Sequence, residues 1–228
     1  MAKASPTTYG LLGLLAVRSW TGYELTQQLR RSLRFVWPSS EGHLYREQKR
    51  LVDLGWATVT VEPVGERSRK RYTITAEGEA ALAEWLESKP GEPRFEIEGI
   101  LRVFYGDLGS PDDLAGALEA TAAAAQNMLD EMLDFVDEYL EEGGPLSMLE
   151  QGLGGPGADR LEFRGRVMFP ERLHVIARVI DITARLLTTI VEFANDMAEQ
   201  VKAWPTTTDP ILTASTRRTL EAIRNRHR

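Results

Sequence analysis

Hydrophobic and polar positions in the first 88 residues follow the order helix, helix, helix, hairpin, helix. Apolar residues recur at helical spacing over four segments, residues 6–17, 22–33, 41–54 and 76–88. Between the last two helices, residues 56–62 and 69–75 alternate apolar and polar side chains, as strands buried on one side do. We expect a β-hairpin there, with a connection longer than two residues. This order of elements predicts a winged helix-turn-helix domain.

Residues with capping chemistry stand where these four helices are expected to begin. A side-chain oxygen at the N-cap accepts a hydrogen bond from a backbone N–H that has no partner within the helix. The predicted N-caps, in chain order, are Thr7 or Thr8, Thr21, Ser39 or Ser40, and Thr75.

Basic residues gather in the third helix and in the hairpin that follows it. On the helix, Arg46, Lys49 and Arg50 fall on or near the side opposite Leu44 and Leu51. The hairpin region carries four more cations, Arg67, Arg69, Lys70 and Arg71. A cationic helix beside a cationic hairpin can hold a DNA duplex, with one element in the major groove and the other on neighbouring phosphates. For the helix cluster taken alone, an ordinary solvated face is the alternative.

The residues of this region are expected to play different parts in DNA binding. Arg46, Lys49 and His43 are candidates for base edges, because arginine or lysine to guanine is the commonest specific contact. The hairpin cations are better suited to phosphates or the minor groove. Thr21 and Tyr23 are candidates for phosphate contact at a helix N-terminus, with half-buried packing as the alternative for Tyr23. The predicted DNA-binding set is Thr21, Tyr23, Ser39, Ser40, His43, Tyr45, Arg46, Lys49, Arg50, Arg67, Arg69, Lys70 and Arg71.

After a linker rich in proline and glycine at residues 89–93, the pattern predicts long helices. A helix with a broad apolar face is expected over residues 94–105. Ser110 caps the next one, which begins at Pro111 and reaches about Glu142. One more helix is expected over residues 210–226, in a C-terminal tail that ends in basic residues.

The clearest periodicity in the chain lies between residues 173 and 204, where apolar positions alternate three and four residues apart. This heptad pattern is typical of helices that pack against one another along their length. We therefore predict dimerisation through Leu173, Ile176, Ile180, Thr183, Leu187, Ile190, Ala194, Met197 and Val201. Further apolar residues widen the stripe beyond a two-stranded seam, which favours a multi-helix arrangement partly across a dimer: Val175, Val179, Leu186 and Phe193.

Charge is unevenly distributed along the 228 residues. The net charge is −7, but residues 1–88 hold 12 Lys and Arg against 10 Asp and Glu, a balance of +2. Residues 89–228 hold 15 against 24, a balance of −9. The division suggests two functions, and only the field near a duplex matters for phosphate contact because salt screens charges over about 8–10 Å.

Several classes of protein are disfavoured by what the sequence lacks. There is no cysteine, and the three histidines show no ligand spacing, so no metal site and no other cofactor are expected. No nucleophile or phosphate-binding constellation appears, and we expect no catalytic residues and no enzyme activity. No long apolar run predicts a signal peptide or a membrane span, so a cytoplasmic protein that binds no membrane fits best.

The N-terminal region resembles the PadR family of bacterial transcriptional regulators. The resemblance lies in an ordered set of short motifs at residues 9–15 (YGLLGLL), 21–25 (TGYEL), 37–45 (WPSSEGHLY), 49–51 (KRL), 54–55 (LG), 69–72 (RKRY), 74–75 (IT) and 77–78 (EG). Many family members have proline where this chain has Arg46. The resemblance implies dimerisation through C-terminal helices and a response to a small hydrophobic or aromatic effector.

Together these observations predict a mainly α protein with a small β-hairpin wing. Residues 1–88 form the winged helix-turn-helix, residues 94–204 a coiled-coil-like helical domain for dimerisation and effector response, and residues 205–228 an extra helix or tail. We expect an effector-responsive homodimeric repressor that binds an inverted-repeat operator in double-stranded DNA. The alternative is a helical interaction module whose winged helix no longer binds DNA.

Overall fold

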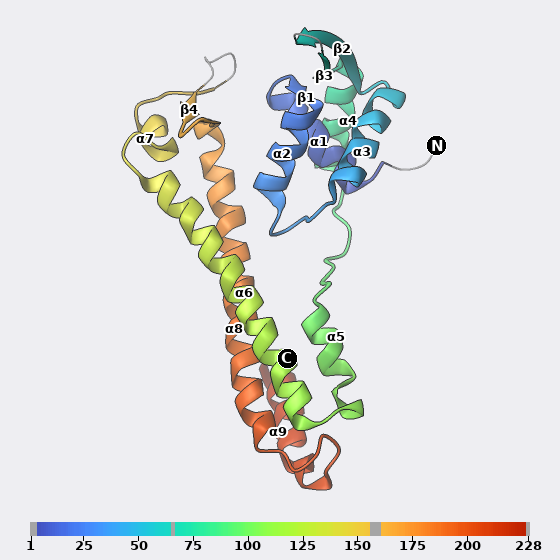
Figure 1. Cartoon of the computed structure of the whole chain (residues 1–228), viewed down its shortest axis with the longest axis vertical. Helices are drawn as coiled ribbons and strands as arrows, with labels where there is room; N and C mark the ends of the chain where they lie inside the picture. Colours follow the sequence, from blue (N-terminus) through green and yellow to red (C-terminus); the bar gives the residue numbers. More distant parts are fainter. Residues whose placement is uncertain (1–3, 65–66, 156–160, 227–228) are drawn as a thin grey trace. The chain divides into compact units, whose positions relative to one another are not determined.

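The computed structural model describes residues 4–64, 67–155 and 161–226, except that the side chains of Val64 and Arg67 lie outside the described part. The chain divides into two compact units, Met1–Pro93 and Arg94–Arg228 (Figure 1). Each unit is described by itself. Helices predominate, with a small antiparallel sheet in the first unit, as the hydrophobic pattern predicts.

Each helix of the first unit begins at a residue whose side chain caps it. The helices are α1 (Pro6–Val17), α2 (Gly22–Leu33), α3 (Glu41–Asp53) and α4 (Ala76–Glu87). Thr21, Ser40 and Thr75 cap the last three, as predicted. The N-cap of α1 is Ser5, whose Oγ accepts from the backbone N–H of Thr8 at 3.1 Å. The prediction of Thr7 or Thr8 as this cap is wrong, because a proline at the first helical position places the cap one residue before it.

The sheet has one more strand than the sequence pattern predicts. Its strands are β1 (Trp20–Thr21), β2 (Ala57–Val64) and β3 (Arg67–Ile74), in the order β1-β3-β2. The hairpin strands pair as far as Val64 opposite Arg67, so the predicted connection of more than two residues is wrong. The strand continues through Pro63 because β2 lies at the sheet edge, where a missing N–H breaks no ladder. The two residues of β1 are too few to produce a visible alternation.

Leucines of the first three helices form the core of the first unit. Leu11, Leu12, Leu15, Leu25, Leu44 and Leu51 are almost completely buried. The indole N–H of Trp20 donates to the carbonyl oxygen of Leu14 at 2.8 Å, which attaches β1 to α1. Because α1 contributes leucines on several sides, it lies centrally and the other helices pack around it.

Two adjacent polar residues fix the position of α3 within this core. The Glu47 carboxylate accepts from the Ser5 hydroxyl at 3.0 Å and from the Thr8 hydroxyl, both at the start of α1. The Gln48 amide nitrogen donates to the Gly22 carbonyl oxygen at 2.9 Å and to the Thr26 hydroxyl at 2.8 Å, both on α2. Glu47 is 7% exposed and Gln48 is 1% exposed. Such buried groups tie the orientation of α3 to two neighbouring helices at once.

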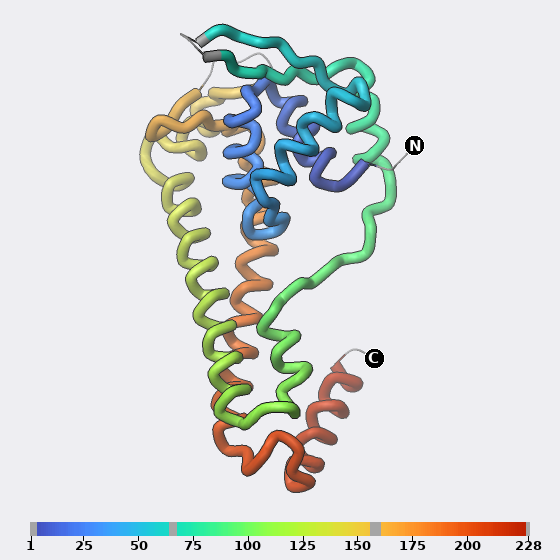
Figure 2. The backbone as a smooth tube through the Cα atoms, turned by 45° about the vertical axis from the view of Figure 1, so that its right-hand side comes forward, coloured from blue at the N-terminus to red at the C-terminus, as the bar shows by residue number. Residues whose placement is uncertain are grey.

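In the second unit, the helices α6 (Pro111–Leu140) and α8 (Leu173–Lys202) run side by side in opposite directions (Figure 2). Before them come α5 (Glu98–Phe104) and the 3₁₀ turn η1 (Gly106–Leu108). Between them lie α7 (Pro145–Glu150), β4 (Glu162–Phe163), β5 (Arg166–Val167) and η2 (Pro170–Arg172). The unit ends with η3 (Pro210–Leu212) and α9 (Thr213–Arg226).

Three features of this unit differ from the prediction. The helix expected from Arg94 begins only at Glu98, after an extended stretch. The helix α7 and the short β4–β5 hairpin were not predicted, because segments of two to six residues are too short for a periodic signal. The N-terminus of α6 follows the prediction, with Ser110 and Asp113 in a capping box.

The predicted heptad seam faces α6 of the same chain along much of its length. Small residues line the contact, where Ala194, Ala198 and Val201 pack against Leu114, Ala115, Leu118 and Ala122. Of the seam, Leu173, Thr183, Leu187, Ala194 and Val201 are buried, while Ile176, Ile180, Ile190 and Met197 are half-buried. The residues predicted to widen the stripe stay exposed, namely Val175, Val179, Leu186 and Phe193. Ile182, which was not part of that prediction, is exposed on the same side of α8. That the predicted seam takes part in dimerisation stays a prediction.

Replacement of Thr8 by Val tests the contact that orients α3. The substitution preserves shape but removes a hydroxyl that donates to the buried Glu47 carboxylate and also accepts from the Ser5 backbone N–H in the capping box of α1. The free energy of unfolding should therefore fall by about 1–3 kcal/mol. Urea denaturation measures the change. Thr60→Val, on an exposed position of β2, is the matched control and should have little effect. Equal stability of the two variants would show that the Glu47 contact does not stabilise the unit.

Candidate nucleic-acid interface

One face of α3 carries its cations into solvent. Tyr45, Arg46 and Lys49 are exposed, whereas Leu44 and Leu51 on the opposite face are buried. Arg46 and Lys49 form no ion pair with any residue that the structure describes, so the two charges are not neutralised locally. A helix with one buried and one exposed face fits the major groove. Its exposed side chains can reach base edges while its buried side chains stay packed in the core.

The N-terminal end of α3 carries two of the predicted residues, Ser39 and Ser40, and Ser40 caps the helix. The Ser40 hydroxyl accepts from the backbone N–H of His43 at 3.3 Å and so serves as the cap. Ser39 and His43 are half-buried, and Arg50 is half-buried near the other end of the helix. Ser39, His43 and Arg50 therefore lie on the same helix as the exposed cations but are less accessible to solvent than Arg46 and Lys49.

An open groove separates α3 from the hairpin. It also takes in the N-terminus of α2, and its volume is about 960 Å³. Six of the predicted DNA-binding residues line it: Thr21, Tyr23, Tyr45, Lys49, Arg69 and Lys70. Residues from three separate elements are therefore brought together by the fold. Glu24 and Asp53 also line the groove, so its walls are not uniformly positive.

At the N-terminus of α2, Tyr23 is an exposed hydrogen-bond donor, whereas the hydroxyl of Thr21 is already bonded within the helix. Tyr23 is 67% exposed, which excludes half-buried packing as its role. Thr21 is buried, and its hydroxyl donates to a Glu24 carboxylate oxygen at 2.8 Å while capping the helix. Burial raises the pKa of Glu24, but the hydrogen bonds from Thr21 and the nearby Arg18 and Arg71 lower it overall.

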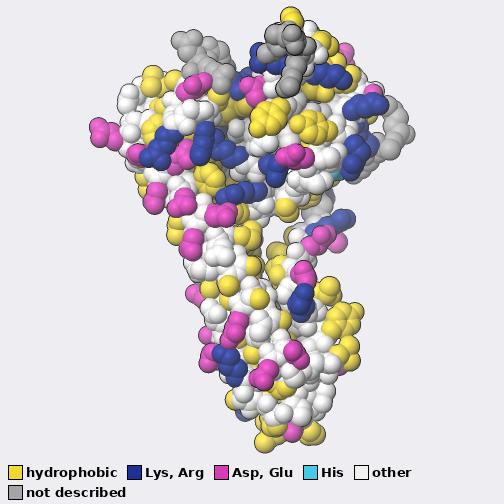
Figure 3. Space-filling view, viewed as in Figure 1, with side chains coloured by type: hydrophobic (Ala, Val, Ile, Leu, Met, Phe, Trp, Pro, Cys, Tyr) yellow, Lys and Arg dark blue, Asp and Glu magenta, His cyan; other side chains and the backbone are white. Residues whose placement is uncertain are grey.

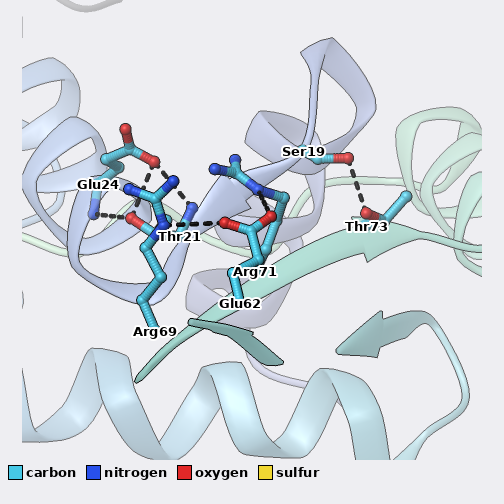
Figure 4. Close-up of polar contacts among 7 residues, drawn as sticks. All are labelled: Ser19, Thr21, Glu24, Glu62, Arg69, Arg71 and Thr73. Carbon is cyan, nitrogen blue, oxygen red and sulfur yellow. Dashed lines mark hydrogen bonds and ion pairs between the residues drawn. The ribbon is translucent and has the colours of Figure 1, made fainter. Parts of the chain in front are cut away.

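On the hairpin, one carboxylate holds two of the predicted cations (Figure 4). Glu62 of β2 accepts from Arg69 Nε at 2.8 Å and from Arg71 Nε at 2.5 Å. The hydrogen bonds from Arg71 and Arg69 lower the pKa of the Glu62 carboxyl, and the same carboxylate raises the pKa of Arg71. Lys70 is exposed on the other face of the strand, and the side chain of Arg67 lies outside the described residues.

Sequence reasoning missed three residues of this region, namely Glu47, Gln48 and Glu62. Gln48 stands four residues after Leu44 and three before Leu51, a spacing that places it on the buried face. Glu62 faces Arg69 once the strand register is known, and that register follows from pairing Val64 with Arg67. Glu47, three residues after Leu44 and four before Leu51, has a similar spacing. Helical spacing was therefore a usable signal for Glu47 and Gln48, whereas Glu62 could be found only from the tertiary structure.

Charged side chains are distributed differently over the two units. On the face drawn in Figure 3, Lys and Arg lie over the sheet end of the first unit and also over the end of the second unit that carries α7 and β4, and Asp and Glu are spread along the long helices. Among the described residues, no group of three or more His, Cys, Asp or Glu could hold a metal ion. None of the helices in that part of the chain is long and apolar enough to cross a membrane.

Comparisons with known proteins agree with this geometry. A model of the Transcriptional regulator PadR-like family matches residues 11–84. The Negative transcriptional regulator PadR of Bacillus subtilis (strain 168) is 24% identical over 148 residues, which cover 64% of this chain and 81% of that protein.

Solved structures share the fold over most of the chain. The crystal structure of Bacillus subtilis PadR in complex with operator DNA has a TM-score of 0.63 at 17% identity, and the match covers 85% of this chain and 98% of that one. The same protein in complex with p-coumaric acid has a TM-score of 0.58 at 18% identity, covering 89% and 100%. The matched residues 11–84 include α3 and the hairpin. The N-terminal unit of this chain thus matches the PadR-like family of transcriptional regulators over residues 11–84.

Proposed function

We propose that this protein regulates transcription as a homodimer that places α3 of each protomer in the major groove of an inverted-repeat operator. The observation that carries the proposal is that Arg46 and Lys49 of α3 are exposed and form no ion pair with any described residue, beside the hairpin and the α2 N-terminus. Two-fold symmetry of the protein requires two half-sites, spaced about one helical turn apart.

Within this proposal the residues divide into base readers and phosphate contacts. Arg46 and Lys49 project from the middle of α3 and serve as the base readers. Tyr23 and Lys70 line the same groove from neighbouring elements and contact phosphates. The alternative, in which the winged helix no longer binds DNA, is not favoured, because Arg46 and Lys49 are exposed and no described carboxylate neutralises them.

We propose a repressor role because the name of one relative states such a function. The Bacillus subtilis protein is a negative transcriptional regulator, and one of its structures contains operator DNA. Another contains p-coumaric acid, so we extend the proposal to a small aromatic effector. Such an effector acts by binding one arrangement of the DNA-binding units better than another. The absence of enzyme activity and the cytoplasmic location stay predictions from the sequence.

The exposed stripe on α8 is the surface that we propose for dimerisation. Val175, Val179, Ile182 and Leu186 follow one another four, three and four residues apart, and Phe193 continues the line one heptad later. Exposed apolar residues at this spacing fit a second helix packed along α8. The buried face of α8 lies beside the stripe and contacts α6, so α8 would lie between two helical partners.

Replacing Arg46 and Lys49 together by Ala tests the base readers. Each good contact to a base edge contributes about 1–3 kcal/mol of discrimination, so operator affinity should fall by at least one order of magnitude. Electrophoretic mobility of DNA from upstream of the gene measures the change. The control is Arg102→Ala with Lys202→Ala, which removes the same charge from ion-paired positions of the second unit. Sequence-specific binding retained by the α3 variant would contradict the assignment.

Replacing Ile182 and Leu186 by Glu tests the dimer surface. Charges on an apolar helix contact must be desolvated or separated, so the variant should be monomeric at micromolar concentrations. Sedimentation equilibrium measures the state of association. Thr188→Glu lies on another exposed side of α8 and should leave the dimer intact. A stripe variant that remains a dimer would place the contact elsewhere.

A further inference from the structure

Glu62 stands between two arginines on the hairpin, and this arrangement follows from the strand register. It lies directly opposite Arg69 in the β2–β3 ladder, and Arg71 is the next residue of β3 on the same face. One carboxylate oxygen accepts from Arg69 and the other from Arg71. Both oxygens are thus occupied by guanidinium groups (Figure 4).

This contact halves the positive charge that the two arginines present. Two guanidinium groups and one carboxylate leave a net charge of +1 where the arginines alone would carry +2. The lowered pKa of Glu62 means that the carboxylate is ionised at neutral pH, so the neutralisation holds under physiological conditions. By contrast, Arg46 and Lys49 on α3 form no ion pair with any carboxylate among the described residues.

The ion pairs are accessible enough for a phosphate to compete with the carboxylate. The side chains of Arg69, Arg71 and Glu62 are 51%, 28% and 31% exposed. Exposed ion pairs are weak, because water and salt screen them. Only the Nε–H of each arginine donates to Glu62, so the other N–H groups of the guanidinium can still bind a phosphate. Such a phosphate must nevertheless approach the negative charge of the Glu62 carboxylate. Phosphate binding to these arginines is therefore less favourable than binding to an unpaired arginine.

We propose that Glu62 limits the affinity of the hairpin for DNA phosphates. This rests on the proposed function and adds a residue that acts against binding rather than for it. Phosphate contacts supply essentially all of non-specific binding. An acidic residue on the hairpin therefore weakens attachment to DNA of any sequence, while the base readers on α3 are left unchanged. The chain then spends less time on the many non-operator sites that compete for it.

Replacement of Glu62 by Gln tests the proposal. Glutamine keeps the size and one hydrogen-bond acceptor but removes the charge. The variant should bind a non-operator duplex several-fold more tightly at about 100 mM salt, and the slope of log K against log salt should steepen by about 0.9 for each additional phosphate that the hairpin neutralises. Fluorescence anisotropy of the full-length protein with a labelled duplex of about 25 base pairs, from about 50 to 200 mM KCl, measures both quantities.

Three further variants separate this effect from a general change in charge. Glu87→Gln makes the same charge change at an exposed position of α4 and should leave affinity and slope close to those of the unaltered protein. Glu62→Gln combined with Arg69→Ala and Arg71→Ala removes the cations that Glu62 holds. If Glu62 acts through these two arginines, that variant should bind no more tightly than one carrying the two alanine replacements alone.

The outcomes distinguish this proposal from the proposed function. Unchanged binding by the Glu62→Gln variant, or an increase in affinity matched by Glu87→Gln, would overturn the role of Glu62 and leave the regulator intact. Weaker binding would also overturn it, and would show instead that the carboxylate orients the arginines toward DNA. If the unaltered protein bound no DNA at any salt concentration, both proposals would fail.

Discussion

The first unit depends on two buried polar side chains that set the orientation of one helix. Glu47 accepts hydrogen bonds from the start of α1, and Gln48 donates to the start of α2. An unpaired buried polar group costs far more free energy than a paired one contributes. Rotations of α3 that would bury the same leucines but break these bonds are therefore disfavoured, and the exposed cations on the opposite face take a defined direction.

Local charge, rather than total charge, decides whether this chain can contact DNA. The net charge of −7 comes from the second unit, and residues 1–88 carry a slight positive balance. Even there, a count of basic residues overestimates what a phosphate would meet, since Glu62 engages both Arg69 and Arg71. The cations of α3 and those of the hairpin therefore differ in how much positive charge they present to a phosphate, although the sequence alone does not distinguish them.

The helix α8 shows how a broad apolar pattern can serve two contacts. Its small residues, such as Ala194 and Ala198, allow α6 to approach closely within the chain. Its larger residues, such as Val179 and Leu186, remain exposed on the adjoining side. A heptad pattern records that a helix has partners along its length, but not whether a partner belongs to the same chain. Only the packing of α6 against α8 distinguished the two faces.

The sequence by itself determined the order of the four helices and the hairpin in the first unit and three of the four N-caps there. It also determined the location of the cations on α3. Each of these features depends on residues close together in the chain. The sequence also sufficed for the resemblance to the family. The tertiary structure decided the partners of Glu47, Gln48 and Glu62, the third strand of the sheet and the division of α8 into two faces. Those features join residues far apart in sequence, and their energies depend on burial and strand register, which periodicity does not encode.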